Sequence, residues 1–331
     1  MDFPGRYRRI QLLAALVVGL LGPLAPLRAG AEPVSVRFVY DWPVADFGMV
    51  PMVVAQQRGL YQKHGLKVDL LFPPDAQTTP RMLATGRADI GFEAATDLVF
   101  AANQGVPIVA IANFTRSNSW CLIGRPGEPI ALTQLKGKSV GIFTDSWTRA
   151  MMAFVLKKAG LRESEVREIT TQNDDIPLLL AGKIDLATNS AGWGVAEVMD
   201  HLHQQPTLAC NADIGVPNIP VWAITAASPW LQTHGAAAQA WLAALAEAID
   251  WSVAHPAEAA QIFTKAYPSA GTLNYSVIGW SYTARLMNGP GGYFKQDDEQ
   301  WRVLAGALRD TGQIAAVKPP SVYYTNAYVP R

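Results

Sequence analysis

One short run in the sequence has the residue spacing of a catalytic serine. Residues 137–141 read Gly-Lys-Ser-Val-Gly and match the G-x-S-x-G pattern, with Ser139 at the nucleophile position. In hydrolases that serine ends a strand and begins a helix, which exposes its hydroxyl at a sharp turn. Here the serine leads into a β-type run, 140–143, and the pattern therefore argues against a hydrolase.

The histidines and cysteines do not have the spacing of a metal site. His201 and His203 are two residues apart in a helical stretch, and residues so spaced do not share a helix face. The sequence has no phosphate-binding loop, no dinucleotide glycine signature and no cysteine pair at metal-ligand spacing. We therefore expect no metal, no cofactor and no catalytic residue. Cys121 and Cys210 are the two cysteines, and their spacing leaves open whether they form a disulfide or stay as buried thiols.

The length and charge of the chain restrict its class. With 331 residues it is long enough for two lobes around a large core. Lysine and arginine number 27, aspartate and glutamate 27, and the formal net charge is zero. This balance argues against a nucleic-acid partner.

The first 31 residues have the pattern of an export signal. A basic start, 6–9, precedes the apolar stretch 10–21, which Gly22 interrupts before it is long enough to span a membrane. We expect residues 1–31 to be a signal peptide cleaved before Glu32, either by the general or by the twin-arginine route. No cysteine lies near the cleavage point, so no lipid anchor is expected.

The elements that would position a site alternate along the chain from residue 34. Short β-branched or apolar runs alternate with helix-like stretches, which is typical of an α/β fold with a largely parallel sheet. The predicted strands are 34–40, 66–71, 90–92, 108–113, 140–143, 166–169, 186–188 and 221–225. The predicted helices are 49–64, 77–85, 96–103, 147–159, 175–181 and 194–203, followed without further strands by 230–251, 256–265, 274–287 and 297–311.

One phrase occurs twice, once in each half of the strand-rich region. Residues 84–89 and 180–185 both end in glycine, a basic residue, a variable residue and aspartate. The repetition indicates two similar lobes, although a generic helix stop followed by a strand would give the same letters.

A series of phrases in fixed order resembles a known family. They are Tyr-Asp-Trp-Pro at 40–43, the run 59–69, and the runs 86–91, 105–112, 135–141, 182–185 and 213–217. Over about residues 34–265 the chain resembles the extracytoplasmic substrate-binding proteins of ABC importers, in the branch related to the thiamine-pyrimidine (NMT1/THI5-like) family and to the sulfonate-binding proteins.

The resemblance implies a type II periplasmic-binding-protein fold with two α/β lobes joined by two hinge strands. The hinge strands are expected near 119–123 and 221–225, and the C-terminal helices are expected to pack on the first lobe. The first lobe would comprise 32–119 and 226–331, and the second 120–225. Such a fold binds its ligand in the cleft between the lobes.

The same resemblance places ligand contacts in the turns after the strands, where helix N-termini and turn side chains face the cleft. Aromatic rings there can stack on a planar heterocycle, and carboxyl and amide groups can bind its edge. The candidate ligand-binding residues are Asp41, Trp42, Asp46, Phe47, Glu93, Thr96, Phe114, Ser117, Asn118, Thr144, Asp145, Ser146, Trp147, Asn189, Trp193, Glu197 and Trp222. Some have structural alternatives: Asp145 or Ser146 is also a suitable helix N-cap, and Trp222 could pack a hinge strand.

The expected function is that of an exported, monomeric, non-enzymatic binding protein. It would capture a small aromatic nitrogen heterocycle, such as a thiamine pyrimidine precursor, in the periplasm and deliver it to an ABC permease and its ATPase. A small organic anion such as an alkanesulfonate is the alternative ligand, and it would need Arg116 or Arg149. The chain departs from pyrimidine-binding relatives at Asp46, where many of them have histidine. Related fungal pyrimidine synthases carry a cysteine-rich iron motif that two distant cysteines do not reproduce.

Overall fold

The computed structural model of the chain describes residues 32–172, 174–287 and 292–330. The signal-peptide prediction falls on residues 1–31 and so lies outside the described residues. Residues 33–331 form one compact unit. Within the described ranges, no helix is both long and apolar enough to cross a membrane.

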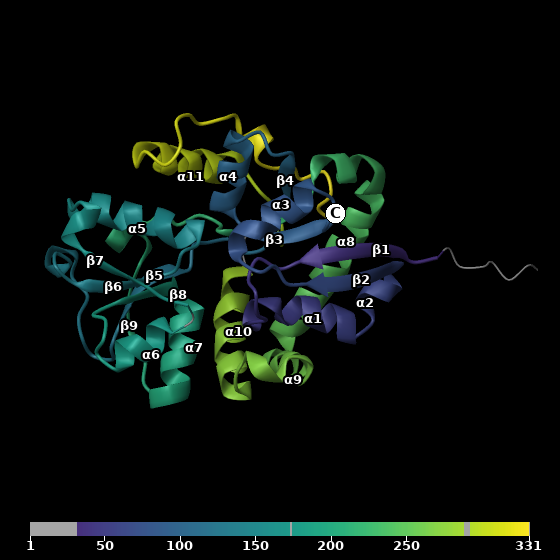
Figure 1. Cartoon of the computed structure of the whole chain (residues 1–331). Helices are drawn as coiled ribbons and strands as arrows, with labels where there is room; N and C mark the ends of the chain where they lie inside the picture. Colours follow the sequence, from purple (N-terminus) through teal and green to yellow (C-terminus); the bar gives the residue numbers. More distant parts are fainter. Residues whose placement is uncertain (1–31, 173, 288–291, 331) are drawn as a thin grey trace, which may run out of the picture. The chain divides into compact units, whose positions relative to one another are not determined.

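A five-stranded sheet forms the first group of elements (Figure 1). Its order is β2-β1-β3-β10-β4, with β1 parallel to β2 and β3, and β10 antiparallel to β3 and β4. The strands are β1 (Val34–Val39), β2 (Leu66–Leu71), β3 (Ile90–Ala94), β4 (Ile108–Asn113) and β10 (Trp222–Ala227).

A second group of strands lies between β4 and β10 in the sequence. One sheet has the antiparallel order β8-β5-β9, and another pairs β6 with β7 in parallel. The strands are β5 (Trp120–Gly124), β6 (Ser139–Ile142), β7 (Arg167–Thr170), β8 (Ala187–Ser190) and β9 (Thr207–Cys210). The prediction of a largely parallel sheet is confirmed for most strands: β1, β2, β3 and β4 run in one direction, β6 is parallel to β7, and β8 and β9 share one direction. The exceptions are β5 and β10, which connect the two groups and enter their sheets antiparallel to their neighbours. Strand β9 has no counterpart among the predicted strands.

The helices match the predicted stretches closely. The one predicted at 49–64 is divided in two, and the others differ by a few residues at their ends. The helices are α1 (Val50–Gln57), α2 (Leu60–Lys63), α3 (Thr79–Ala84), α4 (Ala95–Asn103), α5 (Ser146–Ala159), α6 (Asp175–Leu180), α7 (Ala191–Leu202), α8 (Ser228–Ala254), α9 (Pro256–Ala266), α10 (Leu273–Met287) and α11 (Asp298–Asp310).

The C-terminal helices pack mainly on the first group of strands. Helices α8 and α9 contact α1, and Phe38 of β1 stacks on Trp241 of α8 with ring centroids 5.1 Å apart. Helix α10 contacts both α9 and α7, so it touches the second group as well (Figure 1). This helix is therefore placed to contribute to a cleft between the two groups.

The repeated phrase has the same structure in both places. Gly86 and Gly182 both have φ of 67°, a left-handed conformation that glycine adopts without strain. The backbone N–H of Arg37 donates to Asp89 at 2.8 Å, and the backbone N–H of Ser139 donates to Asp185 at 2.7 Å. In both groups of strands, the aspartate that ends the phrase thus binds the backbone of a neighbouring strand. The repeat is a recurring structural unit.

Cys121 and Cys210 form a disulfide between paired positions of β5 and β9. This answers the question that the sequence left open. The bond closes a loop between residues 89 positions apart.

Candidate functional site

A cavity of about 280 Å³ lies between the two groups of strands. It is lined by the turns that follow β1, β4, β6 and β8, by the end of β3 with the first turns of α4, by β10, and by the inner face of α10. The carboxyl ends of strands and the N-termini of helices meet at such an edge, which is where α/β proteins bind ligands. We take this cavity as the candidate binding site.

Most of the candidate residues line this cavity. Those that do are Asp41, Trp42, Asp46, Phe47, Phe114, Asn118, Asp145, Trp147, Asn189, Trp193 and Trp222. The others lie outside the lining: Ser117 and Thr144 in turns, Thr96 and Ser146 at helix starts, Glu93 within β3 and Glu197 in the middle of α7.

Two of these six residues support the lining from behind. Ser146 donates a hydrogen bond to Asp97, which does line the cavity. Glu93 is fully buried in β3, and among the described residues neither carboxyl oxygen has a hydrogen-bond partner. Burial raises the pKa of Glu93 well above its usual value, with the nearby Asp97 and Asp41 adding to the effect. Glu93 is therefore a buried carboxyl, outside the cavity lining, that holds its proton more tightly than a free glutamate does.

Sequence reasoning missed several lining residues for identifiable reasons. Tyr282, Thr283 and Leu286 come from α10, far from the strand-end turns in sequence. Asp97 lies in the first turn of α4, beyond the strand-end turn itself. The disulfide also lines the cavity. No local signal marks α10 as a wall of the site, because amphipathic periodicity identifies a buried face without identifying what covers it.

One wall of the cavity is a chain of aromatic rings. Trp147 of α5 meets Trp222 of β10 edge to face, with centroids 4.7 Å apart. Trp222 stacks on Phe92 at 5.1 Å, and Phe92 meets Phe114 edge to face at 5.0 Å. The Nε1–H of Trp147 is buried without a hydrogen-bond partner in the described part of the chain. It is therefore a buried donor whose hydrogen-bonding capacity no described residue satisfies.

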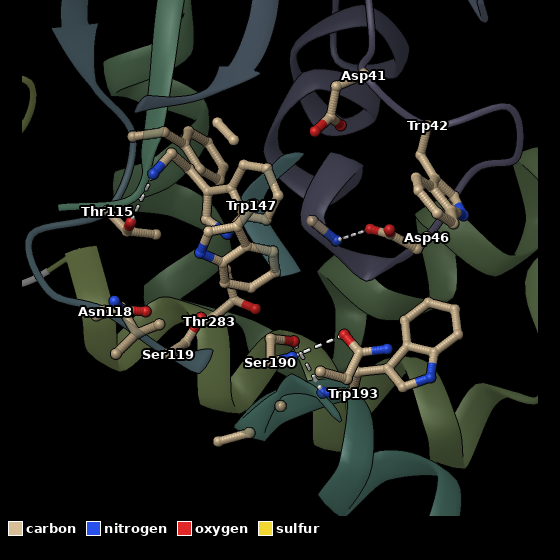
Figure 2. Close-up of a pocket in the computed structure, with 18 of the residues that line it drawn as sticks. Asp41, Trp42, Asp46, Thr115, Asn118, Ser119, Trp147, Ser190, Trp193 and Thr283 are labelled. Atoms are coloured by element: carbon tan, nitrogen blue, oxygen red, sulfur yellow. Dashed lines mark hydrogen bonds between the residues drawn. The ribbon is translucent and has the colours of Figure 1, made fainter. Parts of the chain in front are cut away.

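Aromatic rings also form the opposite side. Trp42 meets Phe143 edge to face at 5.8 Å, which joins the turn after β1 to the turn after β6. Phe47 contacts Trp193 at a centroid distance of 6.3 Å. Figure 2 shows Trp147 on one side of the open space and Trp42 and Trp193 on the other. A flat ligand would therefore be flanked by aromatic rings.

Four carboxyl groups belong to the lining: Asp41, Asp46, Asp97 and Asp145. Asp46 accepts hydrogen bonds from the Tyr40 hydroxyl at 2.8 Å and from the Gly48 N–H at 2.6 Å. Asp145 caps α5 by accepting from the Thr148 N–H at 2.7 Å, and this confirms the N-cap alternative for it. Asp145 can therefore cap α5 and line the cavity at the same time.

Burial is the main reason why these carboxyls hold protons unusually tightly. It raises the pKa of Asp46 to about 6 and that of Asp97 to about 7. The pKa of Asp41 is raised well above its usual range by burial and by the neighbouring Asp46, Asp97 and Asp145. Strongly shifted groups gathered in one cleft are typical of a functional site.

The cavity has no positively charged lining residue among the described residues: its lining contains no lysine, arginine or histidine. Arg149 is exposed on α5 outside the lining. Arg116 lines a separate depression together with Lys295 and Glu299, and its guanidinium donates to the Gly292 carbonyl. Neither arginine that an anionic ligand would need faces this cavity.

Comparison with solved structures shows the fold of the protein. The periplasmic aliphatic sulphonate binding protein SsuA from Escherichia coli matches with a TM-score of 0.66 at 16% identity, covering 88% of this chain and 92% of that chain. The chain has the bilobal α/β fold of the periplasmic binding proteins. The family model described as NMT1/THI5 like matches residues 46–259, and the chain belongs to this family.

The curated relatives include both a bacterial protein and fungal synthases. A putative thiamine biosynthesis protein of Haemophilus influenzae is 23% identical over 85% of this chain and 88% of its own length. A 4-amino-5-hydroxymethyl-2-methylpyrimidine phosphate synthase of Aspergillus parasiticus is 21% identical over 89% of this chain and 87% of its own. The relatives of this chain therefore include one protein named for thiamine biosynthesis and one named for pyrimidine phosphate synthesis.

Proposed function

We propose that the protein is the solute-binding component of an ABC importer and captures a small aromatic nitrogen heterocycle, such as a thiamine pyrimidine precursor. The observation that carries the proposal is the cavity itself, whose lining has aromatic rings on two sides together with carboxyl and amide groups. Rings suit the faces of a heterocycle, and carboxyls accept hydrogen bonds from its amino group and protonated ring nitrogens.

The alkanesulfonate alternative has less support. A bound sulfonate needs hydrogen-bond donors and positive charge, whereas the described lining offers four carboxyls and no cationic side chain. SsuA shares the fold at 16% identity, and a shared fold does not transfer a ligand.

A binding role is also favoured over a synthase role. The sequence has two cysteines, and they pair with each other, so neither is available for an iron motif. Among the described residues no group of three or more histidine, cysteine, aspartate or glutamate side chains is arranged to hold a metal ion. The wall residues have the properties of a ligand cavity: aromatic rings, carboxyls, and the indole N–H groups of Trp147 and Trp193, which have no hydrogen-bond partner among the described residues.

The proposal includes export and delivery. A predicted signal peptide, a disulfide and the binding-protein fold all suit an extracytoplasmic monomer that passes its ligand to a permease and its ATPase. Under this proposal the periplasm is its location, and the two lobes, 32–119 with 226–331 and 120–225, close around the ligand.

Calorimetric titration of the mature chain with 4-amino-5-hydroxymethyl-2-methylpyrimidine tests the proposal. We expect binding with one site, and loss of about 10-fold or more in affinity for Trp42→Ala, since stacking with a buried ring contributes on the order of 1–2 kcal/mol. Trp230→Ala is the matched control, because Trp230 stacks on His234 outside the cavity lining. No heat from the pyrimidine, together with binding of methanesulfonate, would reject the proposal in favour of the anion.

A further inference from the structure

We propose that the cavity selects a positively charged ligand, a small ring or amine with a protonated or quaternary nitrogen, over a neutral molecule of the same shape. The inference rests on the proposed function in one respect: it takes the same cavity as the ligand site. It goes further by assigning the charge of the ligand. It is argued from which groups face the cavity and from which of them lack a partner.

The carboxyls of the lining come from different elements that converge on one space. Asp41 and Asp46 follow β1, Asp97 lies in the first turn of α4, and Asp145 precedes α5. They are close enough for Asp46, Asp97 and Asp145 each to act electrostatically on Asp41. Several ionised carboxylates so close together in a buried site repel one another, which is unfavourable unless a positive charge binds beside them.

Asp41 is the member of the group that accepts no hydrogen bond from another residue within the described part of the chain. Its side chain lines the cavity and the residue is 6% exposed. Asp46, Asp97 and Asp145 each accept a hydrogen bond from another residue, whereas Asp41 accepts none from any other described residue.

The direction of the Asp41 side chain supports a ligand role. Figure 2 shows its carboxyl group pointing into the open space between Trp147 and Asp46. A buried carboxyl is normally satisfied by hydrogen bonds. The structure therefore leaves one acceptor group for the ligand to satisfy.

The aromatic walls add to the attraction for a cation. Trp42, Trp147 and Trp193 line the same cavity from different sides. Tryptophan faces attract cations, with about 2 kcal/mol or more when the pair is removed from water. Aromatic rings alone would bind a neutral heterocycle equally well. Rings together with carboxyls that have no cationic side chain beside them in the described lining favour a positively charged ligand.

The surroundings of these carboxyls contain acids on every side. The titratable groups that act on them or lie against them are Tyr40, Asp41, Asp46, Glu93, Asp97, Asp145 and Tyr275. No lysine, arginine or histidine is among the causes that shift the lining carboxyls. In the described part of the protein, these carboxyls are therefore compensated either by their own protons or by a bound cation, and binding of a cation near neutral pH should release protons.

The test compares three single-ring probes that differ in charge: 4-amino-1-methylpyridinium, neutral 4-methylaniline and 4-aminobenzoate. Titrated into the mature chain at about pH 8, the pyridinium should bind about 10-fold or more tightly than the aniline, and the benzoate should bind more weakly than either. Calorimetry near pH 7 in two buffers of different ionisation enthalpy should show proton release with the pyridinium alone.

Variants identify the charge responsible. Asp41→Asn should weaken pyridinium binding by about 10-fold and leave the affinity for 4-methylaniline unchanged. Asp69→Asn is the matched control, because Asp69 is an exposed carboxyl on β2 outside the cavity lining. Circular dichroism and thermal unfolding of both variants would establish that they fold.

The outcomes separate this inference from the proposed function. Equal affinity for the pyridinium and the aniline, or an Asp41→Asn effect of the same size on both, overturns charge selection while the cavity remains the site. Binding of the pyrimidine with no binding of any of the three probes also overturns it. Binding of the pyridinium but not of the pyrimidine supports charge selection and rejects the heterocycle named above.

Discussion

Trp147 and Trp222 meet edge to face across the junction between α5 and β10, with ring centroids 4.7 Å apart. One ring belongs to the second group of strands and helices, and the other to the strand that returns to the first. The buried Nε1–H of Trp147 has no partner within the described residues. This pair is therefore both a contact between the two groups and part of the cavity wall.

Trp147→Phe should separate binding from stability. Replacing an unpartnered buried donor with an apolar ring costs little, so the free energy of unfolding should fall by no more than about 1.5 kcal/mol. Ligand affinity should fall by about 5-fold or more, because the ligand loses a donor worth about 1 kcal/mol. Urea unfolding and calorimetric titration measure the two effects. If the free energy of unfolding and the free energy of ligand binding decreased by the same amount, Trp147 would contribute by packing alone.

Gly279 of α10 should not tolerate a methyl group. A Cβ at this position would lie 2.2 Å from Cδ1 of Phe47, whose ring lines the cavity. Gly279→Ala should therefore destabilise the fold by about 1–3 kcal/mol through overpacking and weaken ligand binding by displacing Phe47. Thermal unfolding and titration of the same sample give both values.

Gly306→Ala provides the control for that substitution. Gly306 lies in α11 and nothing is within 4 Å of a Cβ built there. Alanine is the better helix former, so this variant should gain about 0.5–1 kcal/mol and leave binding unchanged. If both variants lost similar amounts of stability and ligand affinity, the clash with Phe47 would not be the cause of the effect at Gly279.

The disulfide should contribute strongly to stability. It closes a loop between residues separated by 89 positions, and loops of that length predict a loss of roughly 2–4 kcal/mol in the free energy of unfolding when both cysteines are replaced by serine. Chemical unfolding of the double variant, compared with the oxidised wild-type protein, checks this value, and the reduced wild-type protein is the control for the substitution itself. If the double variant is much less stable than the reduced wild-type protein, the serine hydroxyls rather than the lost disulfide would cause the loss of stability.

Stability without ligand should fall as the pH rises from about 4 to about 7. Asp46 has a folded-state pKa of about 6 and Asp97 of about 7, both raised from 3.8. At pH values between the unfolded-state and the folded-state pKa of these carboxyls, the folded protein binds more protons than the unfolded chain. Their contribution to the free energy of unfolding is therefore present at low pH and is lost as the carboxyls ionise. Asp97→Asn should flatten this dependence and increase stability at about pH 8, relative to the Asp69→Asn control, in urea unfolding at several pH values. An unchanged pH profile would contradict the burial of Asp97.

The repeated phrase should matter for stability alone. Asp89→Ala removes a buried carboxylate that binds the Arg37 backbone and guanidinium, at a cost of about 2 kcal/mol. Asp185→Ala removes the matching bonds to Ser139, on a more exposed side chain, and should cost about 1 kcal/mol. Ligand affinity should not change, because neither residue lines the cavity. Reduced affinity at full stability would assign these residues a role in the site.

The sequence predicted the strand-end turns well because local signals mark them. Asp41 and Trp42 directly follow a run of apolar residues, and the N-cap chemistry of Asp145 is readable from its position before a helix. Both residues line the cavity. The same kind of signal also selected Ser117 and Thr144, which lie outside the lining, because a turn does not reveal which of its side chains point inward.

What the sequence could not supply is long-range pairing. The antiparallel entry of β10 between β3 and β4 depends on how the chain returns from the second group. The contribution of Thr283 depends on α10 lying against α7. Neither relationship leaves a periodicity in the residues themselves.

The disulfide also determines what a single cut in the backbone would do. Every peptide bond from residue 121 to residue 210 lies inside a covalent ring, and this ring carries α5, α7 and the turns that form one side of the cavity. A protease that nicks an exposed loop there leaves both pieces joined until a reductant is added. On a denaturing gel, the nicked protein should therefore run as a single chain without reductant and as two fragments with it, and the nicked form retains every residue of the binding site.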